Sequence, residues 1–158
     1  MSLKATRDRL KGIANSSRNS FLSDLADIHV EWHQTRAVDG SPIGFLSFHR
    51  EMIKYNAKNR KNNGLSPVPK AFSISFINSI EAWDPALTNE ASPTNFSGQV
   101  ESWHNAFHNS AGWPDFHNPR LNIRDDRFWQ FHKFIDGRFN GWLKKRNRKY
   151  LNINHNSV

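Results

Sequence analysis

Apolar residues recur at intervals of three and four in four stretches of this chain, a spacing typical of amphipathic helices. These stretches predict helices over residues 20–34, 43–55, 99–110 and 126–142. Prolines and polar residues break the pattern between residues 59 and 97, where we expect loop with one short helix or strand near residues 72–80. The sequence therefore predicts an all-α fold, a four-helix bundle with long irregular connecting loops.

The two ends of the chain lack this sustained apolar period. Residues 1–18 are polar and basic, which predicts an N-terminal arm or a frayed first helix. Residues 144–158 are basic and rich in Asn, which predicts a loosely held tail. Because a length of 158 residues suits a single core, we expect one four-helix domain over residues 19–143.

The chain is basic, with 22 Lys and Arg against 14 Asp and Glu and a formal charge of +8. The run KKRNRK at residues 144–149, beside Tyr150, invites an interpretation as a nucleic-acid contact. No groove-reading motif accompanies this run, and terminal charge runs are usually solvated tails. We therefore favour a solvated tail and do not expect a nucleic-acid partner.

Cysteine is absent, and no stretch approaches 18 consecutive apolar residues. The first absence excludes disulfides, iron–sulfur clusters, thiolate zinc sites and cysteine nucleophiles. The lack of a long apolar run argues against a membrane span and a secretion signal. We therefore expect a cytoplasmic protein with no membrane partner. The eight histidines then become the main candidates for chemistry.

Six of the eight histidines fall into two copies of one pattern. Each copy is an HxxxH segment, followed later in the chain by FxxFH and a basic residue. These histidines are His29, His33 and His49 in the first copy, and His104, His108 and His132 in the second. The remaining two belong to neither copy: His117 lies in a Pro-bounded segment that predicts a loop, and His155 lies in the tail.

Two histidines four residues apart lie one turn apart on the same face of a helix, where both imidazoles can reach one ion. A third histidine from the next helix completes each set, and Phe45 or Phe128 lies on its face to shield the metal from water. A single HxxxH pair often arises by chance on a solvated helix face. Two such pairs, each followed by an FxxFH segment, favour metal binding. The sequence therefore predicts a binuclear metal centre inside the bundle.

The ligand type narrows the choice of metal. Paired iron or manganese in helical bundles is held by carboxylates in ExxH pairs, which neither copy provides. Glu31 lies two residues from both His29 and His33, which turns it away from the metal face. All-imidazole ligation suits copper or zinc, and the lack of an HExxH glutamate gives no support to a zinc protease.

At these residues the chain resembles the type 3 copper proteins, which are the tyrosinases, catechol oxidases and hemocyanins. FLSFHRE at residues 45–51 resembles the family's first-copper motif FLPWHRE. WHNAFHNSAGW at 103–113 and DDRFWQFHKFID at 125–136 resemble its second-copper motifs HNxxH and DPxFFLHHxxxD, with Phe128 at the packing Phe and Asp136 at the closing Asp. EAWD at 81–84 resembles the YWDW turn between the two halves. The resemblance covers roughly residues 20–143 and implies a four-helix domain around two copper ions.

One position departs from the tyrosinase pattern. The middle ligand of the first copper site lands on Gly40, which has no side chain to bind a metal. His33 can replace it from the first helix, as in the first copper site of arthropod hemocyanins. The resemblance therefore implies two copper ions with these ligand sets: His29, His33 and His49 for one, and His104, His108 and His132 for the other.

The resemblance also implies an oxidoreductase that activates O2 to hydroxylate phenols or to oxidise catechols or aminophenols to quinones. Asn105 matches a position that helps orient a water serving as base in tyrosinases, with a plain helix-surface role as the alternative. Glu101, three residues before His104, is a candidate partner for that water, and Asn109 is expected to touch substrate. The alternative function is an O2- or copper-binding protein without turnover, and a separate copper-delivery partner remains open.

Overall fold

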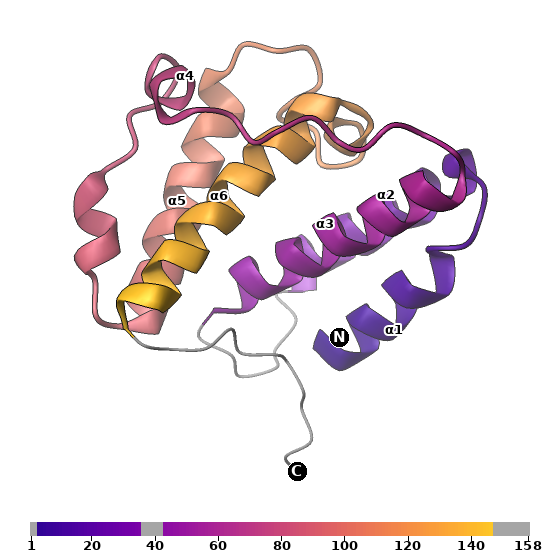
Figure 1. Ribbon diagram of the computed structural model, residues 1–158, viewed down its shortest axis with the longest axis horizontal. Coiled ribbons are helices and arrows are strands. Elements are labelled where there is room, and N and C mark those ends of the chain that lie inside the picture. Colours follow the sequence, from indigo (N-terminus) through magenta and orange to yellow (C-terminus); the bar gives the residue numbers. More distant parts are fainter. Residues whose placement is uncertain (1–2, 36–42, 147–158) are drawn as a thin grey trace.

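The computed structural model describes residues 3–35 and 43–146 of the chain. Within these ranges it contains six α-helices, two 3-10 helices and no β-strand (Figure 1). In chain order the elements are α1 (Leu3–Ile13), α2 (Arg18–Thr35), α3 (Gly44–Asn62), α4 (Ile74–Asn78), η1 (Pro85–Asn89), α5 (Pro93–Ser110), η2 (Asn122–Arg124) and α6 (Asp126–Lys145). The predicted all-α fold class is confirmed.

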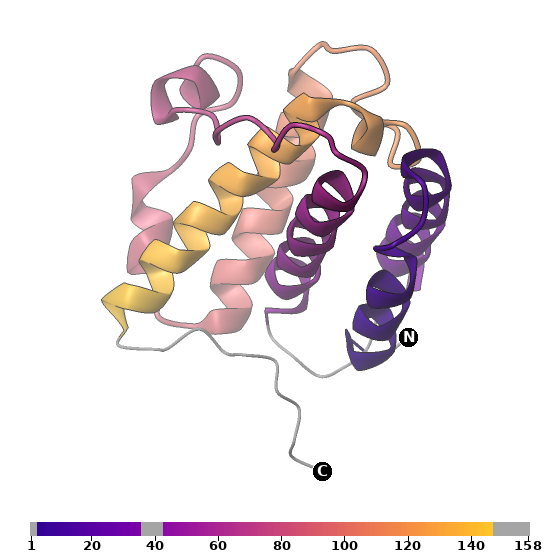
Figure 2. The ribbon, with the colours of Figure 1, turned by 45° about the vertical axis from the view of Figure 1, so that its right-hand side comes forward.

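The body of the molecule is built from the four long helices α2, α3, α5 and α6. Helices α2 and α3 run side by side, and α5 and α6 form a second pair beside them (Figures 1 and 2). Helix α3 packs against α6, α5, α2 and α1, so it is the central element. These four long helices are the ones that the apolar period predicts, and their inward faces meet between the two pairs.

All four of these helices are longer than the sequence predicts, and α3 and α5 differ the most. Helix α3 continues to Asn62 because polar residues in its last turns are buried and hydrogen-bonded. Asn59 Nδ2, for example, donates to the Ser16 carbonyl at 2.9 Å. Helix α5 begins at Pro93, where Ser92 Oγ accepts from the backbone N–H of Asn95 and proline occupies the first turn. Local capping and buried amides, rather than apolar spacing, set these two ends.

The N-terminal segment forms the packed helix α1 rather than a detached arm. Thr6, Leu10 and Ala14 are fully buried, and α1 packs against both α2 and α3. Arg7 forms an ion pair with Glu51 of α3, joining the two helices. The apolar positions of α1 are too few for a sustained period, so the sequence pattern does not reveal its buried side.

Large aromatic rings fill the core between the helix pairs. Trp32 of α2 stacks on Phe48 of α3 with ring centroids 4.5 Å apart. Phe107 of α5 stacks on Phe131 of α6 at 4.0 Å. Burial of each such ring contributes about 2 to 3 kcal/mol, so the helices are held together by side-chain packing around the histidines.

The connections also position the core. The predicted short element near residues 72–80 is helix α4, followed by η1 before α5 begins. In the EAWD segment, Trp83 is buried and lies edge-on to Trp103 at 4.7 Å, while Asp84 caps η1. Gly64, with φ +65°, lets the chain turn after α3. None of the described helices is long and apolar enough to cross a membrane.

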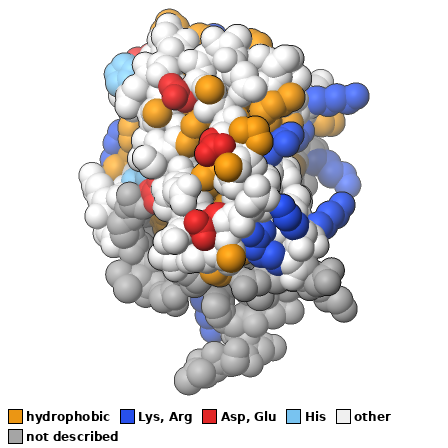
Figure 3. Space-filling view, turned by 90° about the vertical axis from the view of Figure 1, so that its left-hand side faces the viewer, with side chains coloured by type: hydrophobic (Ala, Val, Ile, Leu, Met, Phe, Trp, Pro, Cys, Tyr) orange, Lys and Arg blue, Asp and Glu red, His pale blue; other side chains and the backbone are white. Residues whose placement is uncertain are grey.

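The basic residues at the end of the domain lie partly in helix α6. Lys144 and Lys145 form its last turn, where cations interact favourably with the helix dipole. Gly40 lies outside the described residues, and so do residues 147–158 of the predicted tail, including Tyr150 and His155. On the face shown in Figure 3, acidic side chains lie near the centre and Lys and Arg side chains gather along one edge. That face is therefore of mixed charge.

Candidate metal centre

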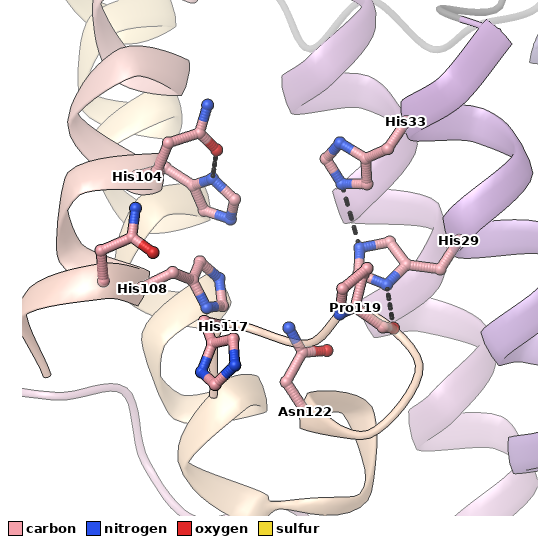
Figure 4. A pocket seen from close by; sticks show the side chains of 9 residues that line it. His29, His33, His104, His108, His117, Pro119 and Asn122 are labelled. Atoms are coloured by element: carbon pink, nitrogen blue, oxygen red, sulfur yellow. Dashed lines mark hydrogen bonds between the residues drawn. The ribbon is translucent and has the colours of Figure 1, made fainter. Parts of the chain in front are cut away.

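Six histidines from the four long helices converge between the two helix pairs. They are His29 and His33 of α2, His49 of α3, His104 and His108 of α5, and His132 of α6. The imidazoles of α2 and α5 face each other across a cavity (Figure 4). His33 stacks with His104 at a centroid distance of 6.4 Å, and His49 stacks with His132 at 4.8 Å. The two predicted sets therefore form one continuous cluster.

The HxxxH spacing accounts for the pairing within each helix. The ring centroids of His29 and His33 lie 4.7 Å apart, and those of His104 and His108 lie 4.4 Å apart. Both distances follow from the single helical turn that separates residues i and i+4. Each pair therefore presents two imidazoles to the same space, as the sequence predicts.

The ligand atoms form two compact groups. His29, His33 and His49 each offer a ring nitrogen within 4.8 Å of the others, and so do His49, His104 and His132. His49 belongs to both groups. Each of these three-histidine groups could hold a metal ion.

His108 takes a different place from the one the sequence predicts. Its ring lies near those of His104 and His132, with centroid distances of 4.4 and 5.7 Å, but it belongs to neither compact group. Its Nδ1 lies 2.7 Å from the Phe116 carbonyl, in the loop after α5. The sequence predicts His108 as the third member of the set with His104 and His132. In the structure the compact group contains His49 in its place.

Hydrogen bonds fix the ring orientation of most of these histidines. Four Nδ1 atoms contact backbone carbonyls: His29 to Pro119 at 2.9 Å, His49 to Phe45 at 2.9 Å, His108 to Phe116 at 2.7 Å and His132 to Phe128 at 2.8 Å. A carbonyl only accepts, so each of these Nδ1 atoms carries the proton and donates it. The opposite nitrogen, Nε2, is then left with a lone pair for a metal.

The Nε2 atoms of His104 and His132 lie 3.1 Å apart. His104 Nδ1 donates to Asn105 Oδ1 at 3.0 Å, so both Nε2 atoms present lone pairs to each other. Their separation is close to the edge of about 3.3 Å expected between two nitrogens bound at about 2.0 Å to a tetrahedral ion. His49 Nε2 is buried without a hydrogen-bond partner. A cation held by His49, His104 and His132 would satisfy these Nε2 atoms.

Burial keeps these imidazoles neutral. Desolvation lowers the pKa of His29 to about 3 and that of His108 to about 4. Desolvation and the neighbouring histidines also hold the pKa values of His49, His104 and His132 well below the usual 6.5. The centre therefore offers uncharged nitrogen ligands at neutral pH, which is the form that binds metals.

The predicted supporting residues also lie at the centre. Phe45 and Phe128 supply carbonyls to His49 and His132 four residues later, and their rings pack on these imidazoles at 4.5 and 3.9 Å. Asp136 lies one turn beyond His132 and accepts a hydrogen bond from Arg50, which follows His49. This ion pair fastens α3 to α6 next to the histidines.

A cavity of about 220 Å³ opens onto the cluster (Figure 4). Asn105 and Asn109, the predicted water-orienting and substrate-contacting residues, both line it and are exposed. Asn105 Oδ1 is engaged with His104. Glu101, the predicted partner of a base water, is not among the residues that line the cavity.

Sequence reasoning missed the contribution of the loop between α5 and α6. His117 and Asn122 line the cavity, and the loop supplies the carbonyl acceptors for His29 and His108. Asn122 is buried and donates to the Phe116 carbonyl at 3.2 Å, while its Oδ1 has no partner. Loops lack a periodic signal, and only the unassigned histidine in a Pro-bounded segment pointed to this region.

Comparison of the chain with protein-family models, curated proteins and solved structures yields no match. The resemblance to type 3 copper proteins therefore stands on the motif residues alone. A function for the chain has to follow from the chemistry of the histidine cluster.

Proposed function

We propose that this protein is a copper-dependent oxidoreductase. It uses O2 at a pair of copper ions to hydroxylate phenols or to oxidise catechols or aminophenols to quinones. The observation that supports this proposal is the set of buried imidazoles whose Nδ1 atoms are engaged by oxygen acceptors and whose Nε2 atoms converge. The two three-histidine groups share His49, whose Nε2 can bind only one ion at a time, so a second copper would take His108, beside His104 and His132, as its third imidazole.

The donor set favours copper. Both compact groups consist of histidine alone, without a carboxylate ligand. Magnesium, calcium and manganese prefer oxygen donors, whereas imidazole suits copper and zinc. Zinc has no redox chemistry, and paired iron in helical bundles is held with carboxylates, so an oxidoreductase with these ligands favours copper. Bound copper would supply O2 activation and electron transfer at this site.

The protein's own residues would orient and shield the reacting groups. The carbonyls of Pro119, Phe45 and Phe128 hold imidazoles in one orientation, which lowers the reorganisation needed on metal binding. The packed rings of Phe45 and Phe128 keep water from that side of the centre. Asn105 accepts from His104, so its Nδ2 remains a donor for the oxygen of an incoming phenol.

The open side of the centre favours turnover over simple O2 carriage. Asn105, Asn109 and His117 are exposed, and they line the route between solvent and the buried histidines. A cavity of about 220 Å³ admits a single aromatic ring. These side chains can hydrogen-bond a polar substrate at the entrance, a feature for which a carrier of O2 has no use.

Copper loading followed by assay of catechol oxidation tests the proposal. We expect about two coppers per chain, quinone formation, and one O2 consumed for every two catechols oxidised, with water as the other product. His132→Ala should remove one copper and abolish quinone formation. His155→Ala, a histidine outside both sequence patterns, is the matched control and should retain both properties.

Two results would overturn the proposal. Protein that binds zinc but takes up no copper when purified with copper present rules out the redox chemistry. Copper-loaded protein that binds O2 reversibly, but turns over no phenol, catechol or aminophenol, supports the carrier function instead. Elemental analysis identifies the first result, and the absorption spectrum after addition of O2 to the reduced copper protein identifies the second.

A further inference from the structure

A second cavity lies between α3 and α6, and we refer to it as the α3–α6 cavity. It has a volume of about 560 Å³ and shares no lining residue with the cavity of the histidine cluster. Its walls are one side of α3 from Ile53 to Lys61, the segment 64–68, and Trp129 and Lys133 of α6. The volume falls in the range of small-molecule sites.

The segment that follows α3 closes this cavity on one side. It leaves the end of α3 and crosses α6 on its way to α4 (Figure 1). Lys133 Nζ donates to the Pro69 carbonyl at 3.0 Å, and Gln130 Nε2 donates to the Lys70 carbonyl at 3.1 Å. Arg60 Nε donates to the Ser66 carbonyl at 2.7 Å. This side of the cavity is therefore formed by a segment that hydrogen bonds hold against α3 and α6.

The lining combines an apolar interior with cationic edges. Ile53, Leu65, Val68 and Trp129 are among the side chains of the apolar wall. Arg60, Lys61 and Lys133 also line the cavity, and no Asp or Glu is among its lining residues in the described part of the chain. Arg60 is paired with Asp126 at 2.8 Å, so Lys61 and Lys133 carry the positive charge of the edge. A ligand with an apolar body and an anionic end complements this arrangement.

Asn56 provides an independent indication of the ligand's chemistry. It lines the α3–α6 cavity and is 1% exposed. Its Oδ1 accepts from Arg18 Nη1 at 2.7 Å, and its buried Nδ2 has no acceptor. Because a guanidinium only donates, the amide cannot be reversed, so Asn56 can offer a ligand only a donor. Nδ2 lies just beneath the cavity lining, so a ligand with an acceptor oxygen would satisfy it after a small shift of the neighbouring side chains.

We propose that the α3–α6 cavity binds a monocarboxylate with an apolar body, of the class of a medium-chain fatty acid. The tail lies along the apolar wall, and the carboxylate accepts from Lys61 and, once neighbouring side chains shift, from Asn56 Nδ2. This site is separate from the histidine cluster, and the inference does not rest on the proposed oxidase function.

Calorimetric titration of the full chain with decanoate, below the concentration at which it aggregates, tests this site. Decylamine and decanol carry the same tail with a cationic or a neutral end, and vesicles of anionic phospholipid test for a membrane surface. We expect one decanoate per chain, bound at least tenfold more tightly than either analogue. Copper content should be unchanged by decanoate.

Variants locate the binding site. Ala57 is an exposed lining residue, so Ala57→Trp fills the cavity without disturbing the core and should abolish decanoate binding. Lys61→Glu should weaken binding by about tenfold, since it reverses one exposed charge beside the carboxylate. Asn56→Asp keeps the acceptor for Arg18 but removes the donor, and should also weaken binding. Lys58→Glu makes the same charge change outside the cavity lining and should have no effect.

Several outcomes would overturn the inference. These are absence of saturable decanoate binding, equal affinity for decanoate and decylamine, and unchanged binding by Ala57→Trp. Binding to anionic vesicles without binding of free decanoate would assign the cationic edge to a membrane surface instead. Circular dichroism of each variant establishes that the loss of binding is local.

Discussion

His49 is the residue that joins the two candidate ligand groups. It is the one histidine common to both three-histidine groups, and its buried Nε2 has no other partner among the described residues. Its Nδ1 is held by the Phe45 carbonyl, so the ring cannot turn to offer the other nitrogen without losing that bond. The two groups would therefore compete for a single imidazole nitrogen if both were to bind a metal.

His49→Ala should lower the metal content more than His108→Ala. The first substitution removes a ligand atom from both groups, whereas His108 belongs to neither of them. Elemental analysis of the two variants, after identical copper loading, measures the difference. Equal losses of copper would instead support the set of His104, His108 and His132 that the sequence predicts.

His33 and His117 both line the cavity but should differ in their effect on metal binding. His33 Nε2 lies 3.1 Å from His29 Nε2 within one group, while the exposed His117 belongs to none. His33→Ala should lose copper and all turnover, and His117→Ala should retain its copper. Loss of copper from His117→Ala but not from His33→Ala would contradict this. It would mean that His117 of the loop, rather than His33 of α2, replaces the ligand that the tyrosinase pattern places at Gly40.

The loop between α5 and α6 acts at the scale of an element, because it supports histidines on both helix pairs. The Pro119 carbonyl holds His29 of α2, and the Phe116 carbonyl holds His108 of α5. Within the loop, the side chain of Asn122 donates a hydrogen bond to the Phe116 carbonyl. Arg120 forms an exposed ion pair with Asp27 of α2. The arrangement of the loop therefore influences imidazoles that are far from it in the sequence.

Asn122→Ala should lower the free energy of unfolding by about 1 to 3 kcal/mol, because a buried hydrogen bond inside the loop is lost. Leu121→Ala, at an exposed neighbouring position, is the control and should change it by less than about 1 kcal/mol. Denaturant titration of the metal-free variants gives both values. Equal stability of the two variants would show that the loop is not anchored through Asn122.

The elements that carry the histidines could be predicted because their apolar residues follow the period of a helix. The spacing of His29 with His33 also fixes their common face. The position of His49 between both groups could not be predicted, since it depends on how α3 packs against α5 and α6. The acceptors at Phe116 and Pro119 are backbone atoms, which leave no signature in the identity of a residue.

At the scale of the whole molecule, aromatic packing and the metal centre place opposing demands on the core. Stacked pairs such as Phe107 with Phe131 stabilise the folded chain, and they also exclude the water that would solvate a protonated imidazole. The core that assembles the ligands therefore makes their protonation costly.

Metal-free protein should lose stability as the pH falls below about 6.5. Burial lowers the pKa of His29 to about 3 and that of His108 to about 4, whereas histidine in an unfolded chain titrates near 6.5. Between these values the unfolded state binds more protons, so the free energy of unfolding rises with pH across this window. At pH 5 one such histidine costs about 2 kcal/mol.

Denaturant titrations of metal-free protein at pH 7.5 and pH 5 measure this effect. His29→Gln provides the comparison, because it removes one of the groups that must stay neutral, and its stability should depend less steeply on pH. A free energy of unfolding that is constant over this interval would mean that the histidines are not buried in solution.

The attachment of the loop to α2 has a consequence for the rate at which metal enters and leaves. The Pro119 carbonyl and the Arg120 side chain reach from the segment between α5 and α6 to His29 and Asp27 on the opposite helix pair. Pro119 also lines the cavity onto which His29 opens, so this attachment borders the route that an ion bound by His29 would take, and loosening it would widen that route. Reversing the charge of Asp27 should hasten metal exchange with a chelator while leaving the equilibrium affinity almost unchanged.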